Sequence, residues 1–255
     1  MRNLAALAAV VGGFAVLAAV PKPQREIVDL TDTIRTGMVR ETLGEAMIEK
    51  YGMHEVQMEP EMTFQKTTGR STYLCVSTQI GTHVDAGAHV EPNGWSVDQI
   101  RLDHLMGSGV VVDVRKKTAE DPVTPADLEK AGIRRGDIVV FLFSYRPPQP
   151  GELYSQSFLT DESARWLVER GARCVGSNTP GLENFKRGVA QKWTNPANQK
   201  VAWPVHKILL GADIPIIEGL TNVDKLLGRK FHFIALPLRI SGADGSPIRA
   251  IAVLE

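Results

Sequence analysis

Hydrophobic positions after Pro23 fall into short runs whose spacing predicts β-strands. The runs at 109–114 and 138–143 are continuously apolar, which is typical of strands covered on both faces. Further strand-like runs occupy 26–30, 71–78, 173–176, 214–217, 231–238 and 248–254. The last two are expected to pair around the Gly-Ala-Asp-Gly-Ser turn that lies between them.

Helical patterns lie between these strands and carry recognisable start and stop residues. Thr124 can cap a helix, Pro125 suits its first position and Gly132 can end it. A second pattern covers 160–171 and a short third one covers 204–211, each ended by a glycine. Strands that alternate with helices in this way predict an α/β class domain.

Two segments show no clear period. Residues 41–62 mix glutamates with methionines, and they predict a helix or loop over the surface. Residues 186–203 contain two tryptophans, several lysines and a Pro-centred amide cluster. A loop of this length in a compact domain is usually functional or disordered, so we expect a lid or a subunit contact there.

The stretch from Gln79 to His89 combines strand alternation with an unusual choice of residues. Its even positions are small or apolar, and its odd positions are Gln79, Gly81, His83, Asp85, Gly87 and His89. An extended backbone would place His83 and Asp85 on one face about 6.6 Å apart, close enough to share one cation.

The two ends of this stretch can join such a site only if the chain bends, because ten residues of strand cover about 33 Å. Gly81 and Gly87 are the expected bend positions, since glycine tolerates sharp turns and close backbone approach. A half-buried strand with packed histidines is the alternative. Two histidines and an aspartate of one parity favour the metal site.

Two residues outside the stretch are candidates for the same site. Trp95 follows a Glu-Pro-Asn-Gly turn and is close enough in sequence to line a substrate pocket beside the metal. Glu218 ends a strand immediately before a glycine, a position suited to ligation or catalysis. For any single tryptophan, ordinary packing is the simpler role.

Composition fits one large domain or two small ones, with 255 residues of which 43% are hydrophobic and 23% charged. The 29 basic and 29 acidic residues cancel without a basic cluster, so nucleic acid is not an expected partner. Nucleophile-elbow, Walker and dinucleotide motifs are absent from the sequence. Cys75 and Cys174 show no zinc-ligand spacing, and buried free thiols are favoured over a bridge.

Residues 1–23 are considered apart from the fold. Arg2 precedes an uncharged apolar run at 4–20 that resembles the start of a secretory signal, and the run is near the lower limit for a membrane span. We expect a periplasmic or secreted protein, or an N-terminal anchor as its one link to a membrane. A cytoplasmic protein, a non-native extension and a packed helix are the alternatives. Residues 24–255 are the expected functional domain.

Taken together, His83, Asp85 and His89 with His206 and Glu218 resemble the cyclase family of metal-dependent hydrolases, whose signature reads H-x-G-T-H-x-D-x-P-x-H. That family includes bacterial kynurenine formamidase and isatin hydrolase. The resemblance runs from Ile27 onward. It also includes the Asp-Leu-Thr opening, Gly-Asp-Ile at 136, the turn at 176–179, and the segments 206–207, 216–220 and 244–249.

The resemblance implies a swivelling β/β/α domain that assembles as a homodimer or homotetramer. It implies one or two divalent ions, zinc or manganese, per subunit. A first ion would be held by Gln79, His83 and Asp85. A second would be held by Asp85, His206 and Glu218, and His89 would donate and accept protons.

Two positions depart from the signature. Gln79 stands where the signature has histidine, and an amide oxygen is a weaker and harder ligand, so zinc affinity is expected to fall and manganese or magnesium to be better matched. Gly87 replaces the signature proline, which is expected to loosen the turn that follows Asp85.

The expected activity is hydrolysis of a carbon–nitrogen amide bond in a small, aromatic N-formyl amide or lactam by a metal-activated water. Two other interpretations stay open at this point. One is a noncatalytic metal-binding or ligand-binding homologue, made possible by the change at Gln79. The other is a metal-dependent cyclase or dehydratase that uses the same ligands.

Overall fold

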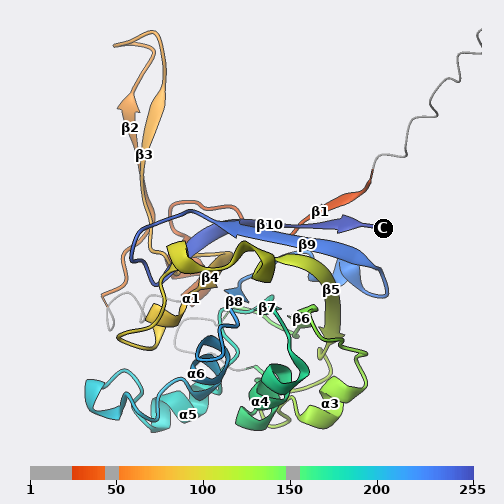
Figure 1. The fold of residues 1–255 in the computed structure, drawn as a ribbon. Coiled ribbons are helices and arrows are strands. Elements are labelled where there is room, and N and C mark those ends of the chain that lie inside the picture. The colour runs from red at the N-terminus through yellow and green to blue at the C-terminus, as the bar shows by residue number, and fades with distance from the viewer. Residues whose placement is uncertain (1–24, 44–51, 148–155) are drawn as a thin grey trace, which may run out of the picture.

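An eight-stranded mixed sheet organises the computed structural model, which describes residues 25–43, 52–147 and 156–255 (Figure 1). A separate two-stranded hairpin accompanies it. The strands are β1 Ile27–Asp29, β2 Gln57–Met62, β3 Ser71–Cys75, β4 His83–Asp85, β5 Met106–Asp113, β6 Ile138–Leu142, β7 Cys174–Ser177, β8 Ile216–Glu218, β9 Phe231–Pro237 and β10 Gly245–Leu254.

The large sheet closes on itself like a barrel. Its order is β1-β10-β4-β8-β7-β6-β5-β9, and β9 also pairs with β10, from Phe231 opposite Leu254 to Pro237 opposite Ile248. The pairs β5–β6, β6–β7 and β7–β8 are parallel, and the remaining pairs are antiparallel. Closure gives β9 and β10 a partner on both edges, which removes open edges from this part of the sheet.

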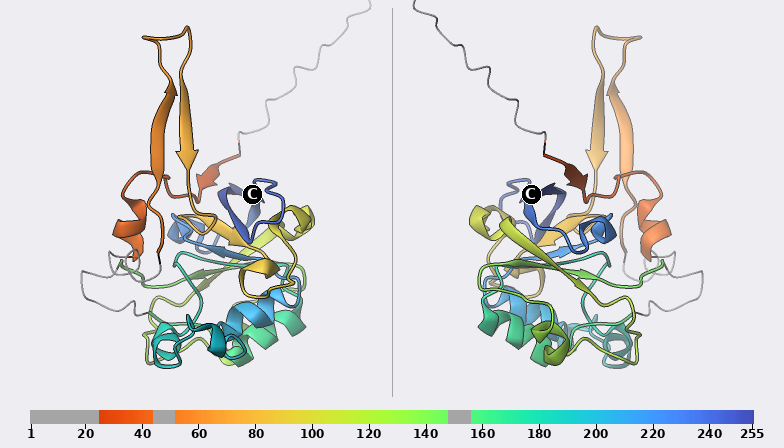
Figure 2. Two further views of the ribbon diagram at one scale, coloured as in Figure 1. Left: turned by 90° about the vertical axis from the view of Figure 1, so that its left-hand side faces the viewer. Right: turned by 90° about the vertical axis from the view of Figure 1, so that its right-hand side faces the viewer.

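Helices α3, α4 and α6 pack against the parallel part of the sheet (Figures 1 and 2). The helices are α1 Met38–Leu43, α3 Pro125–Glu129, α4 Asp161–Arg170, α5 Phe185–Ala190 and α6 Pro204–Leu210. Strand β6 shows the layering, because Ile138 and Val140 belong to the hydrophobic cluster on one face while Val139 and Phe141 belong to the cluster shared with α3, α4 and α6. Burial on both faces is the reason that its sequence is continuously apolar.

Short 3-10 turns connect these elements. They are η1 Gly87–His89, η2 Val97–Gln99, η3 Leu102–His104, η4 Pro196–Asn198 and η5 Val223–Leu226. The predicted start residues act as expected in two helices. Thr124 forms a capping box with Asp127 before α3, and Thr160 accepts a hydrogen bond from Ser163 N at the start of α4. The predicted α/β fold class is confirmed as a mixed, barrel-like sheet with few helices.

Three local predictions need correction. Strand β2 lies at 57–62, where the sequence predicted a helix or loop, because its pairing with β3 supplies order that six exposed residues do not encode. Helix α5 overlaps the start of the predicted loop at 186–203, and Asn184 caps it by accepting from Arg187 N. Cys75 is exposed rather than buried, while Cys174 is buried, and both thiols are free.

The hairpin of β2 and β3 projects from the body of the molecule (Figure 2). Several of its apolar side chains are solvent-exposed: Met58, Met62, Phe64, Tyr73 and Leu74. A two-stranded ribbon is marginally stable by itself in water. The hairpin is therefore an exposed apolar surface that a packing partner would stabilise.

The predicted signal or anchor at 1–23 lies outside the described residues, and it stays a prediction. Among residues 25–43, 52–147 and 156–255, every helix is too short or too polar to cross a membrane.

Candidate metal centre

Strand β4 presents the central motif, and the turn before it depends on Gly81. This glycine has a φ of 59°, in the left-handed region that glycine adopts readily. Its carbonyl accepts a hydrogen bond from His83 Nδ1 at 3.0 Å. Because Nδ1 then carries the hydrogen, Nε2 of His83 is left available as a ligand atom.

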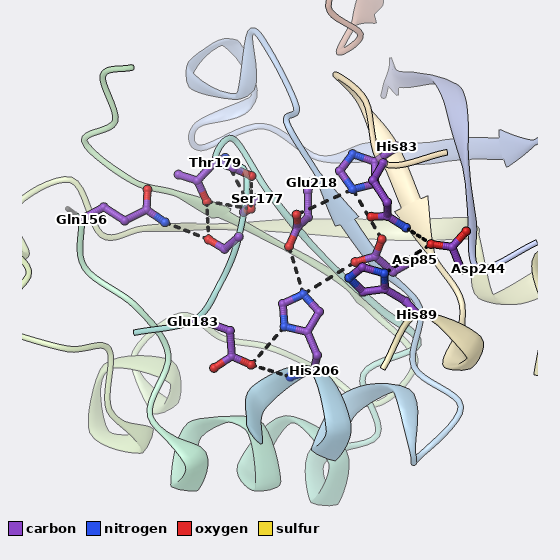
Figure 3. A network of polar contacts seen from close by, with 12 residues as sticks. His83, Asp85, His89, Gln156, Ser177, Thr179, Glu183, His206, Glu218 and Asp244 are labelled. Carbon is purple, nitrogen blue, oxygen red and sulfur yellow. Dashed lines mark hydrogen bonds and ion pairs between the residues drawn. The ribbon is translucent and has the colours of Figure 1, made fainter. Parts of the chain in front are cut away.

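Four buried side chains from three elements converge beside β4 (Figure 3). His83 and Asp85 come from β4, His206 from α6 and Glu218 from β8. His83 and Glu218 are directly opposite in the β4–β8 pair, with His83 Nε2 lying 3.7 Å from Glu218 Oε2. His206 Nε2 lies 3.2 Å from Glu218 Oε1 and 3.7 Å from Asp85 Oδ2. The structure therefore brings His206 and Glu218, which are distant in sequence, next to the two residues of β4.

The centre of this cluster has the properties of a cation site. Asp85 is fully buried and His83 is 4% exposed. His83 Nε2 and both carboxylate oxygens of Asp85 have no hydrogen-bond partner among the described residues. Buried polar atoms are costly when unpaired, and a carboxylate is especially so, because it leaves its hydration behind. Two imidazoles and two carboxylates are suitable ligands for zinc or manganese, so the residues fit a divalent cation.

The ligand atoms form two overlapping sets. The first set is His83, Asp85 and Glu218, and the second is Asp85, His89 and His206, with all atoms of a set within 4.8 Å of one another. Asp85 belongs to both sets. The grouping differs from the one that the family resemblance implies, because Glu218 lies with His83 and the predicted proton carrier His89 lies with His206.

Protonation of the cluster reflects its charges. Burial by itself lowers the pKa of His83, but the neighbouring carboxylates of Asp85, 3.4 Å from its Nε2, and of Glu218 raise it to about 9. Burial raises the pKa of Asp85, but the charges of His89, His83 and His206 lower it to about 2. Burial also opposes protonation of His206, yet its carboxylate neighbours raise its pKa well above the ordinary value. Without a cation, protons on the histidines offset the charge of the carboxylates.

Glu183 orients His206 from the side away from Asp85. This carboxylate is 1% exposed, and its Oε1 accepts from His206 Nδ1 at 3.0 Å and from His206 N at 2.9 Å. A carboxylate of this kind fixes the tautomer of a histidine and leaves Nε2 to face a metal. No sequence pattern indicated Glu183, because only the fold brings the segment after β7 into contact with His206 in α6.

His89 lies at the exposed rim of the cluster. Its side chain is 27% exposed, and its Nδ1 lies 3.4 Å from Oδ2 of Asp244. The same Oδ2 accepts a hydrogen bond from Gln79 Nε2 at 2.9 Å. Gln79 and His89 thus meet at one carboxylate. Asp244 begins the segment 244–249 shared with the family, but its local sequence indicates no role for it.

Trp95 and Trp203 make different packing contacts. Trp95 packs against Gly87, where an added Cβ would lie 2.9 Å from Trp95 Nε1, and its indole donates to Leu210 O at 3.1 Å. Trp203 is the tryptophan beside the cluster, with its ring 5.8 Å from that of His206. This close contact with Trp95 explains why position 87 is a glycine, which a loosened turn does not explain. The substrate-binding role of Trp95 stays a prediction.

Known proteins are similar to this chain in sequence and in fold. The sequence model of the cyclase family, described as “Putative cyclase”, matches residues 28–184. A kynurenine formamidase of Erythrobacter litoralis is 30% identical over 235 residues, which cover 90% of this chain and 94% of that protein. Cyclase-like protein 3 of Oryza sativa subsp. japonica is 28% identical over 256 residues, 92% of this chain and 85% of its own.

Solved structures agree with this family placement. Isatin hydrolase A from Labrenzia aggregata, bound to benzyl benzoate, superposes with a TM-score of 0.70 at 27% identity, covering 91% of this chain and 94% of that one. A potential metal-dependent hydrolase with cyclase activity superposes with a TM-score of 0.66 at 25% identity, covering 90% and 98%. The similarity extends over nearly the whole length of both proteins.

Proposed function

Because the chain belongs to the cyclase family of hydrolases, we propose that it cleaves a carbon–nitrogen amide bond in a small, aromatic N-formyl amide or lactam with a divalent cation. The observation that carries this proposal is the buried cluster in which His83 Nε2 and both oxygens of Asp85 lack hydrogen-bond partners within the described part of the chain. The names of the relatives, kynurenine formamidase and isatin hydrolase, support the substrate class.

The cation would be held by the buried cluster. His83, Asp85 and Gln79 are the proposed ligands of a first zinc or manganese ion, and Asp85, His206 and Glu218 those of a second. When bound, such an ion lowers the pKa of a water molecule and polarises a carbonyl oxygen. The other histidines and carboxylates of the cluster are buried, whereas His89 is partly exposed. A substrate would therefore approach the cluster from the side on which His89 lies.

His89 is the proposed proton carrier. A carboxylate can only accept a hydrogen bond, so in the contact with Asp244 the hydrogen is on Nδ1, and Nε2 is left for proton transfer. Nε2 would take a proton from the attacking water and return it to the leaving nitrogen. The partly exposed position of His89 allows it to reach a substrate that the buried histidines cannot reach.

A substrate screen tests the proposed activity. N-formylkynurenine, isatin and simple lactams would be incubated with the purified protein, with added Mn²⁺, with added Zn²⁺ and with excess chelator. We expect hydrolysis of at least one compound with metal and its loss in chelator. Full activity in excess chelator would remove the metal from the mechanism, and binding without turnover would favour the noncatalytic alternative.

Replacing His89 by alanine is expected to lower kcat by roughly a hundredfold or more, because proton transfer by a positioned group contributes at least that much. Metal content measured in the same sample separates proton transfer from ligation. His104→Ala, which removes a histidine outside the cluster, serves as the control and should keep kcat within about twofold. An unchanged kcat for His89→Ala would end its proposed role.

We also propose that the protein is a homodimer or homotetramer in which the β2–β3 hairpin packs on a second copy. Met58 and Leu74 are directly opposite in this hairpin and therefore share one face, with 48% of each residue exposed. Because the formal net charge is zero, no long-range electrostatic repulsion opposes the association of two copies.

The double variant Met58→Glu/Leu74→Glu is expected to shift the mass measured by light scattering toward that of a monomer, since charges on an apolar interface remain unpaired. Leu102→Glu changes an exposed leucine outside the hairpin and should leave the mass unaltered. A monomeric parent protein at micromolar concentration, or an unaltered mass in the double variant, would contradict the proposal.

A further inference from the structure

The carboxylate of Asp244 lies at the rim of the histidine–carboxylate cluster (Figure 3) and faces three hydrogen-bond donors. Its Oδ1 accepts from Thr78 Oγ1 at 2.8 Å, and its Oδ2 accepts from Gln79 Nε2 at 2.9 Å and faces His89 Nδ1 at 3.4 Å. The hydrogen bond from His89, with those from Thr78 and Gln79, holds the pKa of Asp244 well below its usual range. The carboxylate therefore stays charged at neutral pH.

The backbone fixes Asp244 relative to Asp85. Its carbonyl accepts from Ala86 N at 2.8 Å, and the next residue, Gly245, is directly opposite Asp85 in the β10–β4 pair. Asp244 is thus held at a set distance from the centre of the cluster.

The side chain of Gln79 occupies space that is open because residue 245 is a glycine. An added Cβ on Gly245 would lie 2.6 Å from Gln79 Nε2 and 2.7 Å from Val84 O, so only glycine leaves room for the amide here. Since a carboxylate cannot donate, the amide must turn its NH₂ toward Asp244. The amide oxygen is then at the opposite corner of the amide group, away from Asp244.

We infer that Asp244 is a positioning residue that acts on two groups at once, an inference that rests on the proposed function. Through Gln79 Nε2 it turns the amide oxygen toward the cation that His83 and Asp85 would hold. Through His89 Nδ1 it fixes the tautomer that leaves Nε2 free for proton transfer. Glutamine can then replace an imidazole as a ligand because a fixed amide loses little freedom when it binds a cation.

The test measures Mn²⁺ affinity by competition with a chelating indicator, without any substrate. The proteins are the parent, Asp244→Ala, Gln79→Ala and the double variant. We expect about 10- to 100-fold weaker binding for Asp244→Ala, as for other residues that orient metal ligands. In the Gln79→Ala background the same change should have no further effect, because Asp244 would act through the amide.

Matched variants separate positioning from general support. Asp98→Ala removes a nearby carboxylate that accepts hydrogen bonds from Ser96 Oγ and Gly242 N, outside the cluster. This variant should change the affinity less than about threefold. Asp244→Asn keeps the shape of the side chain if alanine prevents folding. As a second readout, the pH profile of kcat should change in Asp244→Ala and not in Asp98→Ala.

The outcomes distinguish this inference from the proposed function. A parent protein that binds Mn²⁺ and an Asp244→Ala variant that binds it equally well would overturn the inference and leave the proposed function standing. Additive effects of Asp244→Ala and Gln79→Ala would also overturn it. A parent protein that binds no divalent cation at all would overturn both.

Discussion

Replacing Asp85 by asparagine is expected to lower kcat/KM by roughly a thousandfold or more and to remove most divalent-cation binding. Asp85 belongs to both sets of ligand atoms, and its two oxygens lie 3.4 Å from His83 Nε2 and 3.7 Å from His206 Nε2. An amide has one acceptor oxygen and no charge, so it cannot serve both sets. Loss of about 4 kcal/mol of electrostatic stabilisation corresponds to a thousandfold in rate.

Steady-state kinetics and metal analysis of the same preparation measure this effect. Asp113→Asn is the matched control, because Asp113 ends strand β5 and pairs with Arg115 outside the cluster. Its kcat/KM should stay within about twofold of the parent value. Thermal unfolding checks that the Asp85→Asn variant still folds. If Asp85→Asn is folded and keeps nearly full activity, the cluster does not bind the functional cation.

Removing the cation is expected to reverse the pH dependence of stability above neutral pH. The folded-state pKa of His83, about 9, is above its ordinary value of 6.5, so its protonated form stabilises the metal-free fold fully below pH 6.5. This contribution is lost as the pH rises through 9. Asp85, with its pKa lowered from 3.8 to about 2, contributes above pH 3.8 and loses its effect as the pH falls through 2.

Cation affinity depends on pH in the opposite direction, because histidine must be neutral to bind a metal. The affinity therefore rises from pH 6.5 to 9, where the stability of the metal-free fold falls. At a cation concentration of about 100 times Kd, binding adds about 2.7 kcal/mol to the free energy of unfolding. For a chain of this size, that raises Tm by about 5 to 10 °C. The difference in Tm between loaded and chelated protein should therefore widen from pH 6.5 to 9.

Differential scanning fluorimetry at about pH 6, 7.5 and 9, with and without chelator, measures this difference. In His83→Ala the decline of the metal-free Tm above pH 6.5 should be reduced, since the group with the raised pKa is removed. His104→Ala should follow the parent curve. Coincident curves with metal and with chelator at pH 9 would contradict the prediction.

The local sequence determined the strand character of the motif and the parity of its side chains. His83 and Asp85 share one face because alternate residues of a strand always do, whatever surrounds them. The bend at Gly81 followed from glycine, whose backbone freedom is a property of the residue itself. Buried strands such as β6, and the capped starts of α3 and α4, are also encoded by neighbouring residues. Glu218 was also indicated locally, by its position at a strand end before a glycine, whereas the inclusion of His206 came from the family resemblance.

Only the tertiary structure decided which distant groups complete the site. The segment after β7 places Glu183 beneath His206, and the start of the closing strand β10 places Asp244 between Gln79 and His89. These contacts join residues 23 to 165 positions apart. Periodicity describes the faces of a single element and carries no information on which elements become neighbours. That choice is made by the closure of the sheet and by the packing of α6 on it.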